Sequence, residues 1–431
     1  MNVGSRVGGW VRRVSFALLA LLLASDSALA HGKKSRFVLE EATISDIHKA
    51  ILTRKLTATE LVVRYLERIK AYNGTCVDEP EGILGPITMI PNAGKLNALM
   101  TLNLRPKHRL AWGFDERKAR SMTDPVDDDP GMPDALETAA LLDWRFRKTG
   151  KLVGPLHGVV IALKDQYDTF DMRTTSGADA FWANDRPPDD STVAARLRAA
   201  GAILLAKANM DEYAGGDARS SFGGTGCNAY DTERDPGGSS GGSAVAVAAN
   251  FVTCAIAEET GGSIIKPARW NNVVGIVPTR ELVSADGMIQ RGVNTRVGPM
   301  CRTVEDVARI LDAYAGYDPK DELTAFSKGR KPPKPYYEYA KRKNLKGYRT
   351  LNWTGISGRG FAAMTVPAGF TTRVYDRGPD GELLPPIASA LPVGMDVLGL
   401  PFTEHVVFEI GSAYEAASRN RSQPPGFGPL D

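Results

Sequence analysis

The sequence has few of the residues that build metal centres and almost no net charge. It contains 5 histidines and 4 cysteines in 431 residues. The histidines are scattered without the i, i+3 or i, i+4 spacing of metal ligands, and none has a cysteine at ligand spacing, so we expect no zinc site. Lys and Arg total 53 against 50 Asp and Glu, a formal net charge of +3. This balance argues against a strongly basic nucleic-acid-binding protein.

Long hydrophobic runs are also lacking. The apolar run from Phe16 to Ala24 has nine residues, well short of the about 20 that span a bilayer. Arg12 and Arg13 precede it, and the small residues of Ala28-Leu29-Ala30 follow it. This order predicts a secretory signal peptide over residues 1–30, cleaved after Ala30, and a secreted or periplasmic protein without a stable membrane anchor. An uncleaved anchor is the less favoured alternative, and the arginine pair leaves ordinary or twin-arginine export open.

The four cysteines, Cys76, Cys227, Cys254 and Cys301, all lie after the predicted leader. An exported chain can form disulfides, and four cysteines can pair completely in three ways. Cys254 stands in the apolar run 251–256, which favours a small buried hydrophobic residue. The pairing to test first is Cys76 with Cys227.

Short apolar runs alternate with helical patterns after residue 154. Strands are predicted at 159–163, 203–206, 361–366 and 391–398, and helices at 57–73, 191–200, 303–314 and 405–420. Strands that alternate with helices predict an α/β fold with a largely parallel sheet covered on both faces. Residues 31–431 are expected to form one domain, and the Asp-rich segment 122–134 is expected to be a solvated surface loop.

Two Gly-Gly-Ser turns stand apart from the rest of the chain. One lies in residues 236–243 and the other in 259–263, with an apolar helix and strand predicted between them. Glycines allow tight turns and bring backbone amides close to a bound group. The lysine of a P-loop is absent from both turns, and the helix that follows the first one argues against a flexible linker. Upstream, Lys164 ends an apolar strand, where a lysine must be paired, neutral or solvated.

These segments resemble the amidase signature family. The resemblance runs from about residue 154 to residue 300 and resumes at 361–367 and from 391 onward. It implies a three-layer α/β/α fold with a mixed, mainly parallel central sheet. The residues that carry it occur in the family's order: 158–165, 196–202, 207–209, 236–243 and 260–263.

The resemblance implies a Ser–Ser–Lys triad. Ser263 matches the nucleophile, Ser239 the bridging serine on an unusual cis peptide bond after Gly238, and Lys164 the base. Such a base works near neutral pH only when its surroundings favour the uncharged amine, because the reference pKa of lysine is about 10.4.

The resemblance also assigns the residues around the triad. The backbone N–H groups of Thr260, Gly261, Gly262 and Ser263 would form the oxyanion hole, and Ala214 and Ser240 would contact substrate. The implied activity is hydrolysis of a carboxamide or an amidated peptide through an acyl-enzyme, with no metal or organic cofactor.

The chain departs from the family pattern at several positions. Glu258 stands where a small or hydroxyl residue is usual, Val277 where lysine is usual, and Glu281 where glycine is usual. We expect these changes to alter neighbouring contacts rather than the triad. A family α/β section is missing near residues 349–351, which keeps open an alternative: a catalytically impaired amidase-like protein that binds an amide or peptide ligand.

Other functions and partners also come into question. The family includes the glutamyl-tRNA amidotransferases, which work in the cytoplasm with partner chains, but the predicted leader argues against that role. A Ser-Lys peptidase that cuts internal peptide bonds is a third hypothesis. The expected partner is a small amide or an amidated peptide and not a nucleic acid, and the sequence leaves the oligomeric state open.

Overall fold

The computed structural model describes residues 37–180, 184–215, 219–347 and 361–430. The chain divides into the units 1–37 and 38–431, and every element below belongs to the second. The predicted signal peptide and the position of the missing section near 349–351 lie outside the described residues. In the described part of the chain, no helix has the length and apolar character needed to cross a membrane.

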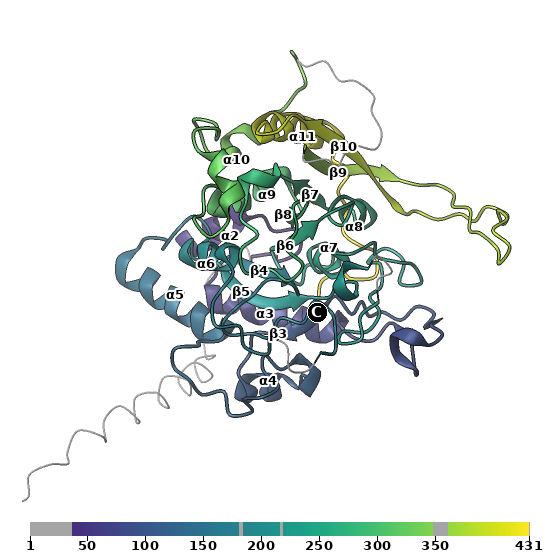
Figure 1. The fold of residues 1–431 in the computed structure, drawn as a ribbon, viewed down its shortest axis with the longest axis horizontal. Helices are drawn as coiled ribbons and strands as arrows, with labels where there is room; N and C mark the ends of the chain where they lie inside the picture. Colours follow the sequence, from purple (N-terminus) through teal and green to yellow (C-terminus); the bar gives the residue numbers. More distant parts are fainter. Residues whose placement is uncertain (1–36, 181–183, 216–218, 348–360, 431) are drawn as a thin grey trace, which may run out of the picture. The chain divides into compact units, whose positions relative to one another are not determined.

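The centre of the second unit is an 8-stranded sheet with the strand order β10-β9-β7-β8-β6-β4-β5-β3 (Figure 1). A separate two-stranded ribbon is formed by β1 (Val77–Asp78) and β2 (Thr88–Met89). The strands of the large sheet are β3 (Leu99–Leu102), β4 (Val160–Lys164), β5 (Ile203–Ala208), β6 (Cys254–Glu259), β7 (Val274–Val277), β8 (Arg296–Cys301), β9 (Ala362–Phe370) and β10 (Pro392–Gly399).

The sheet is mixed, as expected. It was also expected to be mainly parallel, but most pairs of neighbouring strands in it are antiparallel. Strand β4 pairs in parallel with β5 and with β6. The other five pairings among these strands, β3–β5, β6–β8, β7–β8, β7–β9 and β9–β10, are antiparallel. The strand–helix alternation continues along the chain as far as β7, and β4 to β7 run in one direction. The antiparallel pairs arise because β8 runs back between β6 and β7, β9 and β10 form a hairpin next to β7, and β3 pairs with β5 at the other edge. Such connections put antiparallel strands side by side.

Helices cover both faces of the sheet and give the expected three layers (Figure 1). α7 and α8 pack on one face, while α6, α9 and α11 lie over the other. The helices are α2 (Ile44–Leu52), α3 (Ala58–Tyr72), α4 (Pro106–Trp112), α5 (Ala135–Thr149), α6 (Thr192–Ala199), α7 (Gly241–Ala248), α8 (Ile265–Trp270), α9 (Val304–Tyr314), α10 (Tyr336–Tyr339) and α11 (Glu404–Ser418). Short 3-10 turns are η1 (Gly82–Leu84), η2 (Glu116–Lys118), η3 (Glu212–Ala214), η4 (Arg280–Leu282) and η5 (Glu322–Ser327).

Local sequence signals explain where several helices begin. The Thr57 hydroxyl accepts the Glu60 N–H at 3.0 Å, and the Glu60 carboxylate accepts the Thr57 N–H at 2.8 Å. This reciprocal capping box satisfies two backbone donors at the start of α3. Ser191 and Thr303 cap α6 and α9 with their hydroxyl oxygens. The predicted helices at 57–73, 191–200, 303–314 and 405–420 are therefore confirmed with ends shifted by a few residues.

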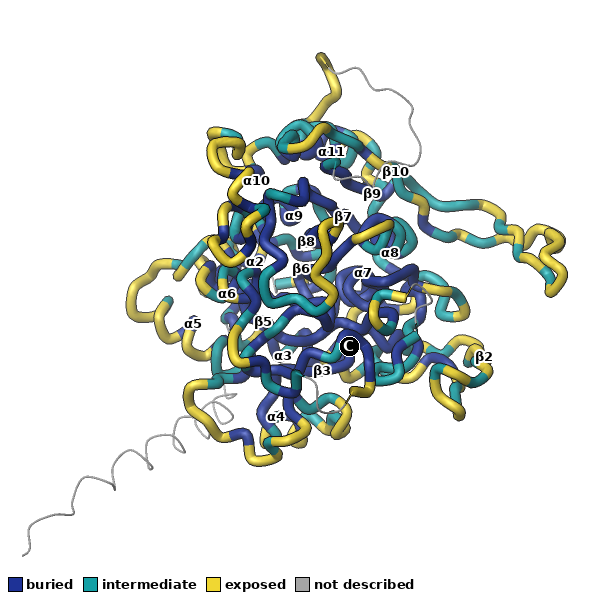
Figure 2. The backbone as a smooth tube through the Cα atoms, viewed as in Figure 1, coloured by how far each residue is buried: buried dark blue, intermediate teal, exposed yellow. Residues whose placement is uncertain are grey.

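A large hydrophobic cluster lies on the face of the sheet that carries α6, α9 and α11, and the fully buried α7 packs on the other face. It is built from the apolar side chains of β4, β6, β7 and β9 and of these three helices. Figure 2 shows these elements as a continuous buried region, whereas the segment between β9 and β10 is largely exposed. Since β4, β6 and β7 are buried on both sides, their sequences are largely apolar rather than alternating.

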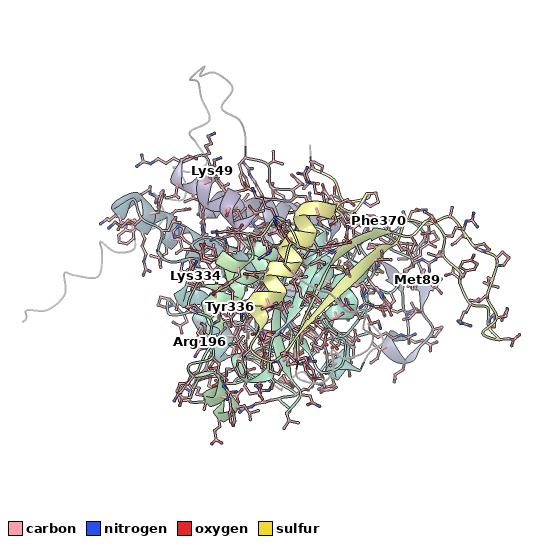
Figure 3. All side chains as sticks on the ribbon, turned by 90° about the horizontal axis from the view of Figure 1, so that it is seen from above. Lys49, Met89, Arg196, Lys334, Tyr336 and Phe370 are labelled. Atoms are coloured by element: carbon pink, nitrogen blue, oxygen red, sulfur yellow. A yellow bond between two sulfur atoms is a disulfide. The ribbon has the colours of Figure 1, made fainter. Side chains whose placement is uncertain are left out.

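The segment between β9 and β10 forms a hairpin that extends from the sheet (Figure 1). Val374 pairs with Ile387 across this hairpin. Its base is fixed to the body at two points. The Phe370 ring, labelled in Figure 3, lies 5.7 Å from the Tyr230 ring, and Arg234 forms an ion pair with Asp376 at 2.8 Å.

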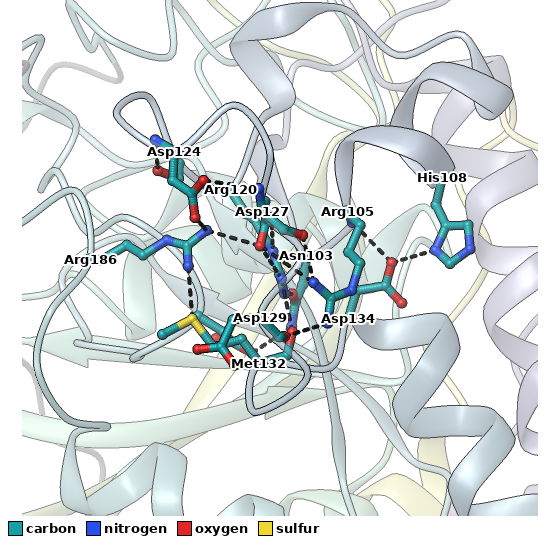
Figure 4. A network of polar contacts seen from close by, with 12 residues as sticks. Asn103, Arg105, His108, Arg120, Asp124, Asp127, Asp129, Met132, Asp134 and Arg186 are labelled. Carbon is teal, nitrogen blue, oxygen red and sulfur yellow. Dashed lines mark hydrogen bonds and ion pairs between the residues drawn. The ribbon is translucent and has the colours of Figure 1, made fainter. Parts of the chain in front are cut away.

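The Asp-rich segment 122–134 is a mostly exposed loop, as expected, but two of its side chains, Asp127 and Asp134, are buried. Asp127 is buried and forms ion pairs with Arg120 and Arg186 (Figure 4). Arg105 donates hydrogen bonds to the backbone oxygens of Asp127 and Asp129. A buried carboxylate needs such partners, and most of them are contributed by residues distant in the sequence.

The four cysteines form two disulfide bonds, which together make up one of the three possible complete pairings. Cys76 is bonded to Cys227, the pairing that the sequence placed first, and Cys254 is bonded to Cys301. Cys254 is buried, as the sequence favoured, but it is bonded to Cys301 and is not simply a small hydrophobic residue. Cys254 and Cys301 are directly opposite each other on the antiparallel strands β6 and β8, with Cα atoms 4.5 Å apart. Only the strand register brings them together.

Candidate active site

Lys164 is the last residue of β4 and is fully buried. Its Nζ donates a hydrogen bond to Ser239 Oγ at 2.7 Å, and a longer one of 3.3 Å reaches the backbone oxygen of Glu258. β4 and β6 are parallel neighbours, so their carboxyl ends lie at the same edge of the sheet. The structure thus brings together two of the three predicted triad side chains, from positions 75 residues apart.

The first Gly/Ser turn holds Ser239 against the end of β5. The Gly238–Ser239 peptide bond is cis, as the resemblance implied, and the Asp211 N–H donates to the Ser239 backbone oxygen at 3.2 Å. A Cβ on Gly238 would lie 2.0 Å from Asp211 Oδ2, far inside van der Waals contact. Glycine is therefore required at this position so that the chain can approach Asp211 closely.

The two predicted substrate-binding residues lie in different settings. Ser240 is buried, and its hydroxyl donates to the Glu258 backbone oxygen at 3.1 Å, so it already has a partner within the protein. Ala214 ends η3 with a φ of 60°, in the left-handed region that a non-glycine residue adopts only under local constraint. Their role in substrate binding stays a prediction.

The second Gly/Ser turn, residues 260–263, joins β6 to α8. Glu259 organises this turn: its carboxylate accepts the N–H groups of Ile264 at 2.9 Å and Ile265 at 3.0 Å and forms an ion pair with Arg296 at 3.3 Å. Burial raises the pKa of the Glu259 carboxyl, while these N–H groups and Arg296 act in the opposite direction. The carboxylate therefore fixes the path of the chain on both sides of the turn.

The donors predicted for the oxyanion hole are not equivalent. The Gly262 N–H lies near the Glu259 carboxylate and helps to lower the pKa of that carboxyl. Gly261 is exposed, and a Cβ there would have no heavy atom within 4 Å. The assignment of the N–H groups of Thr260, Gly261, Gly262 and Ser263 to an oxyanion hole stays a prediction. Ser263 is half-buried just before α8 and stays the predicted nucleophile.

The contact that sequence reasoning missed is made by Glu258. Its carboxylate lies 3.1 Å from Lys164 Nζ, and its other oxygen accepts the Thr260 hydroxyl at 2.7 Å. The expectation that this departure would leave the triad untouched is wrong, because Glu258 contacts the predicted base directly. The sequence did contain a signal for this contact: a carboxylate stands near the end of one apolar strand and a lysine at the end of another. A buried charge needs an opposite charge beside it, so the two could have been expected to pair.

Among the residues described by the structure, no group of three or more His, Cys, Asp or Glu side chains is arranged to hold a metal ion.

Comparison with known proteins identifies the family of the chain. Residues 131–357 match the family model described as Amidase. The chain belongs to the amidase family. Among curated proteins, a probable amidase from Arabidopsis thaliana is 34% identical over 340 residues, which covers 77% of this chain and 56% of the relative. A glutamyl-tRNA(Gln) amidotransferase chain from a Synechococcus strain is 44% identical over 218 residues, which covers 50% of this chain and 41% of that protein.

Solved amidase structures share the fold. The native peptide amidase from Stenotrophomonas maltophilia matches with a TM-score of 0.67 at 24% identity and covers 90% of this chain and 99% of that one. An amidase family protein from Bacillus anthracis matches with a TM-score of 0.64 at 22% identity, covering 90% and 92%. The chain spans about half the length of the curated relatives it matches.

Proposed function

We propose that this amidase family hydrolase cleaves a carboxamide C–N bond with a Ser263–Ser239–Lys164 triad. The observation that carries the proposal is the buried hydrogen bond from Lys164 Nζ to Ser239 Oγ, 2.7 Å long. A serine hydroxyl is a weak nucleophile until a base takes its proton, and the contact supplies a base with a hydroxyl to relay that proton.

The proposed reaction has two halves. In the first, Ser263 Oγ attacks the amide carbonyl carbon, its proton passes to Ser239, and Ser239 gives its own proton to the amine of Lys164. Breakdown of the tetrahedral intermediate releases ammonia or an amine, which takes a proton back along the same path. In the second, water attacks the acyl-enzyme by the same relay and releases the carboxylic acid.

Backbone N–H groups of Thr260, Gly261 and Ser263 stabilise the negative oxygen of the intermediate in this proposal. They are aimed by the turn that Glu259 anchors. Loss of one donor of this kind typically costs about 10²–10³-fold in turnover. An amidated peptide is the first substrate to test, because a structure named peptide amidase has the same fold.

The second candidate is a catalytically impaired amidase-like protein that binds an amide or peptide. The ion pair between Glu258 and Lys164 favours it, because a carboxylate stabilises the ammonium form, which cannot accept a proton. Turnover measured over a wide pH range separates the two candidates.

The experiment compares the wild type with Ser263→Ala, Ser239→Ala and Lys164→Ala on amidated and unamidated peptides and on small amides. Each variant is expected to lose at least about 10³-fold in kcat, as removal of a triad member does elsewhere. Ser243→Ala is the matched control, because Ser243 is a buried serine four residues from Ser239. Equal activity in the wild type and the three triad variants would refute the triad, and cleavage of internal peptide bonds would indicate a peptidase.

We also propose that the chain is exported and cleaved after Ala30. The two disulfides support this, since disulfides persist mainly in oxidising compartments. Expression with the native N-terminus, followed by mass spectrometry of the periplasmic and secreted fractions, tests it. A mature N-terminus at His31 is expected, and a protein that keeps residues 1–30 in the cytoplasm would contradict the proposal.

A further inference from the structure

We propose that Glu258 is a positioning residue that holds Lys164 as an ammonium ion in the resting protein and thereby confines amide hydrolysis to alkaline pH. This inference rests on the proposed function of Lys164 as the base.

The geometry links Glu258 to both halves of the site. One carboxylate oxygen lies 3.1 Å from Lys164 Nζ, and the other accepts the hydroxyl of Thr260 in the second Gly/Ser turn. The side chains of Lys164 and Glu258 are 0% and 3% exposed, so water screens this ion pair little. The carboxylate thus connects the base to the turn that carries Ser263.

The other charges near the pair have partners of their own. On β6, Glu259 pairs with Arg296 of β8 at 3.3 Å, and the charge of Arg296 also interacts with Glu258 through space. Tyr167, after β4, interacts with the charge of Glu258 through space, and burial together with that charge raises the pKa of its phenol, so it stays neutral. Lys164 forms an ion pair in direct contact with Glu258, at 3.1 Å.

The opposite face of the sheet carries a separate set of charges. Lys207 of β5 donates to Thr174 Oγ1 at 2.7 Å and interacts with the charge of Asp165. Asp211, after β5, lies beside the first Gly/Ser turn, where a Cβ on Gly238 would meet its carboxylate. The described charged groups around the site therefore leave the Lys164–Glu258 pair intact.

A buried carboxylate at this distance favours the protonated form of an amine. Before Ser239 can pass a proton to Lys164, the ammonium must first release one to solvent. A plot of kcat against pH should therefore rise on its acidic side. The pH of that rise, the acidic limb, should report the release of the ammonium proton. Removal of the carboxylate charge should move that limb to lower pH by about one unit or more, the usual size of an ion-pair effect.

Two variants separate charge from position. Glu258→Gln removes the charge, but its amide oxygen can accept from Lys164 Nζ while its NH₂ group donates to the Thr260 hydroxyl. Glu258→Thr introduces the hydroxyl side chain usual in the family and serves if the Gln variant does not fold. Thr260→Val is the control, since it cuts the link to the turn and keeps the carboxylate beside Lys164.

The first measurement is kcat against pH on an amidated peptide. An acidic limb that moves to lower pH by about one unit in Glu258→Gln or Glu258→Thr, and stays in place in Thr260→Val, supports the proposal. An unchanged limb in both Glu258 variants overturns it.

The second measurement does not require turnover. NMR of protein labelled with ¹³C at lysine Cε follows the ionisation of Lys164, whose signal is assigned by its loss in Lys164→Arg. A titration midpoint at lower pH in Glu258→Gln than in the wild type supports the inference, and an equal midpoint overturns it. If the wild type and Glu258→Gln hydrolyse no amide at any pH, the proposed function fails, and this titration still decides the role of Glu258.

Discussion

Lys164 and Lys207 stand one residue out of register on the parallel strands β4 and β5, and they point to opposite faces of the sheet. Lys207 is paired with Leu163, and Lys164 with Ala208. Because side chains of residues in register share a face, Lys207 lies on the face of Leu163. Both lysines are fully buried, yet Lys164 contacts Ser239 whereas Lys207 contacts Tyr167 and Thr174.

This arrangement predicts different effects of the same substitution. Lys207→Met should lower the free energy of unfolding by about 1–3 kcal/mol, because the Thr174 hydroxyl and the Tyr167 backbone oxygen lose a buried donor. The folded fraction should keep kcat within about threefold of the wild type, since Lys207 lies on the other face, whereas Lys164→Met should abolish turnover. Urea unfolding and amide hydrolysis measure the two effects. Loss of kcat in Lys207→Met equal to that in Lys164→Met would contradict the separation of the two faces.

The two Gly/Ser turns should differ in their tolerance of a side chain. A Cβ on Gly242 would lie 2.4 Å from the backbone oxygens of Ala98 and Asn209, neither of which is at the end of a flexible side chain. Gly242→Ala should therefore destabilise the fold by about 3 kcal/mol through overpacking. Gly261→Ala is the control and should change stability by less than about 0.5 kcal/mol, because nothing lies within 4 Å of its Cβ position. Equal unfolding midpoints in urea for the two variants would contradict this contrast.

Asp306 predicts a pH dependence of stability. It is buried near the start of α9, where its carboxylate accepts the Ile44 N–H at 3.1 Å, and burial raises its pKa to about 6. Between pH about 4 and about 6, the folded chain keeps this proton while the unfolded chain has lost it, so stability from this group falls as pH rises. Asp306→Asn keeps an oxygen for Ile44 and removes the ionisation, so the fall should be smaller. Urea unfolding at pH 4.5 and at pH 7 measures this fall in unfolding free energy, and Asp128→Asn, at an exposed position, is the control. An equal change in unfolding free energy between the two pH values in the wild type and in Asp306→Asn would count against this prediction.

The disulfides predict both a thiol count and a stability difference. The chain unfolded without reductant should show no titratable thiol, because Cys76, Cys227, Cys254 and Cys301 are all paired. Removal of the cross-strand bond in the double variant Cys254→Ala/Cys301→Ala should cost about 2–5 kcal/mol of unfolding free energy. The single variant Cys254→Ala is the control and should show one thiol. Two or more thiols in the unreduced wild type would refute the pairing.

Much of the architecture could be read from local signals. The capping residues Thr57, Ser191 and Thr303 marked helix starts correctly, because an N-cap depends on residues within one turn. The direction of neighbouring strands could not be read in this way. It depends on which strands pair across the sheet, and the position of β8 between β6 and β7 leaves no local trace.

The candidate chemistry could be inferred from the order of motifs alone: the Lys164 strand end and the two Gly/Ser turns indicated the family and the triad residues. The tertiary structure alone decided that Lys164 hydrogen-bonds Ser239, that Cys254 is bonded to Cys301, and that Glu258 reaches the base. The physical reason is that burial, ion pairing and strand register bring together groups that are distant along the chain. A buried charge is stabilised by the neighbour that folding places beside it, and no local pattern specifies that neighbour.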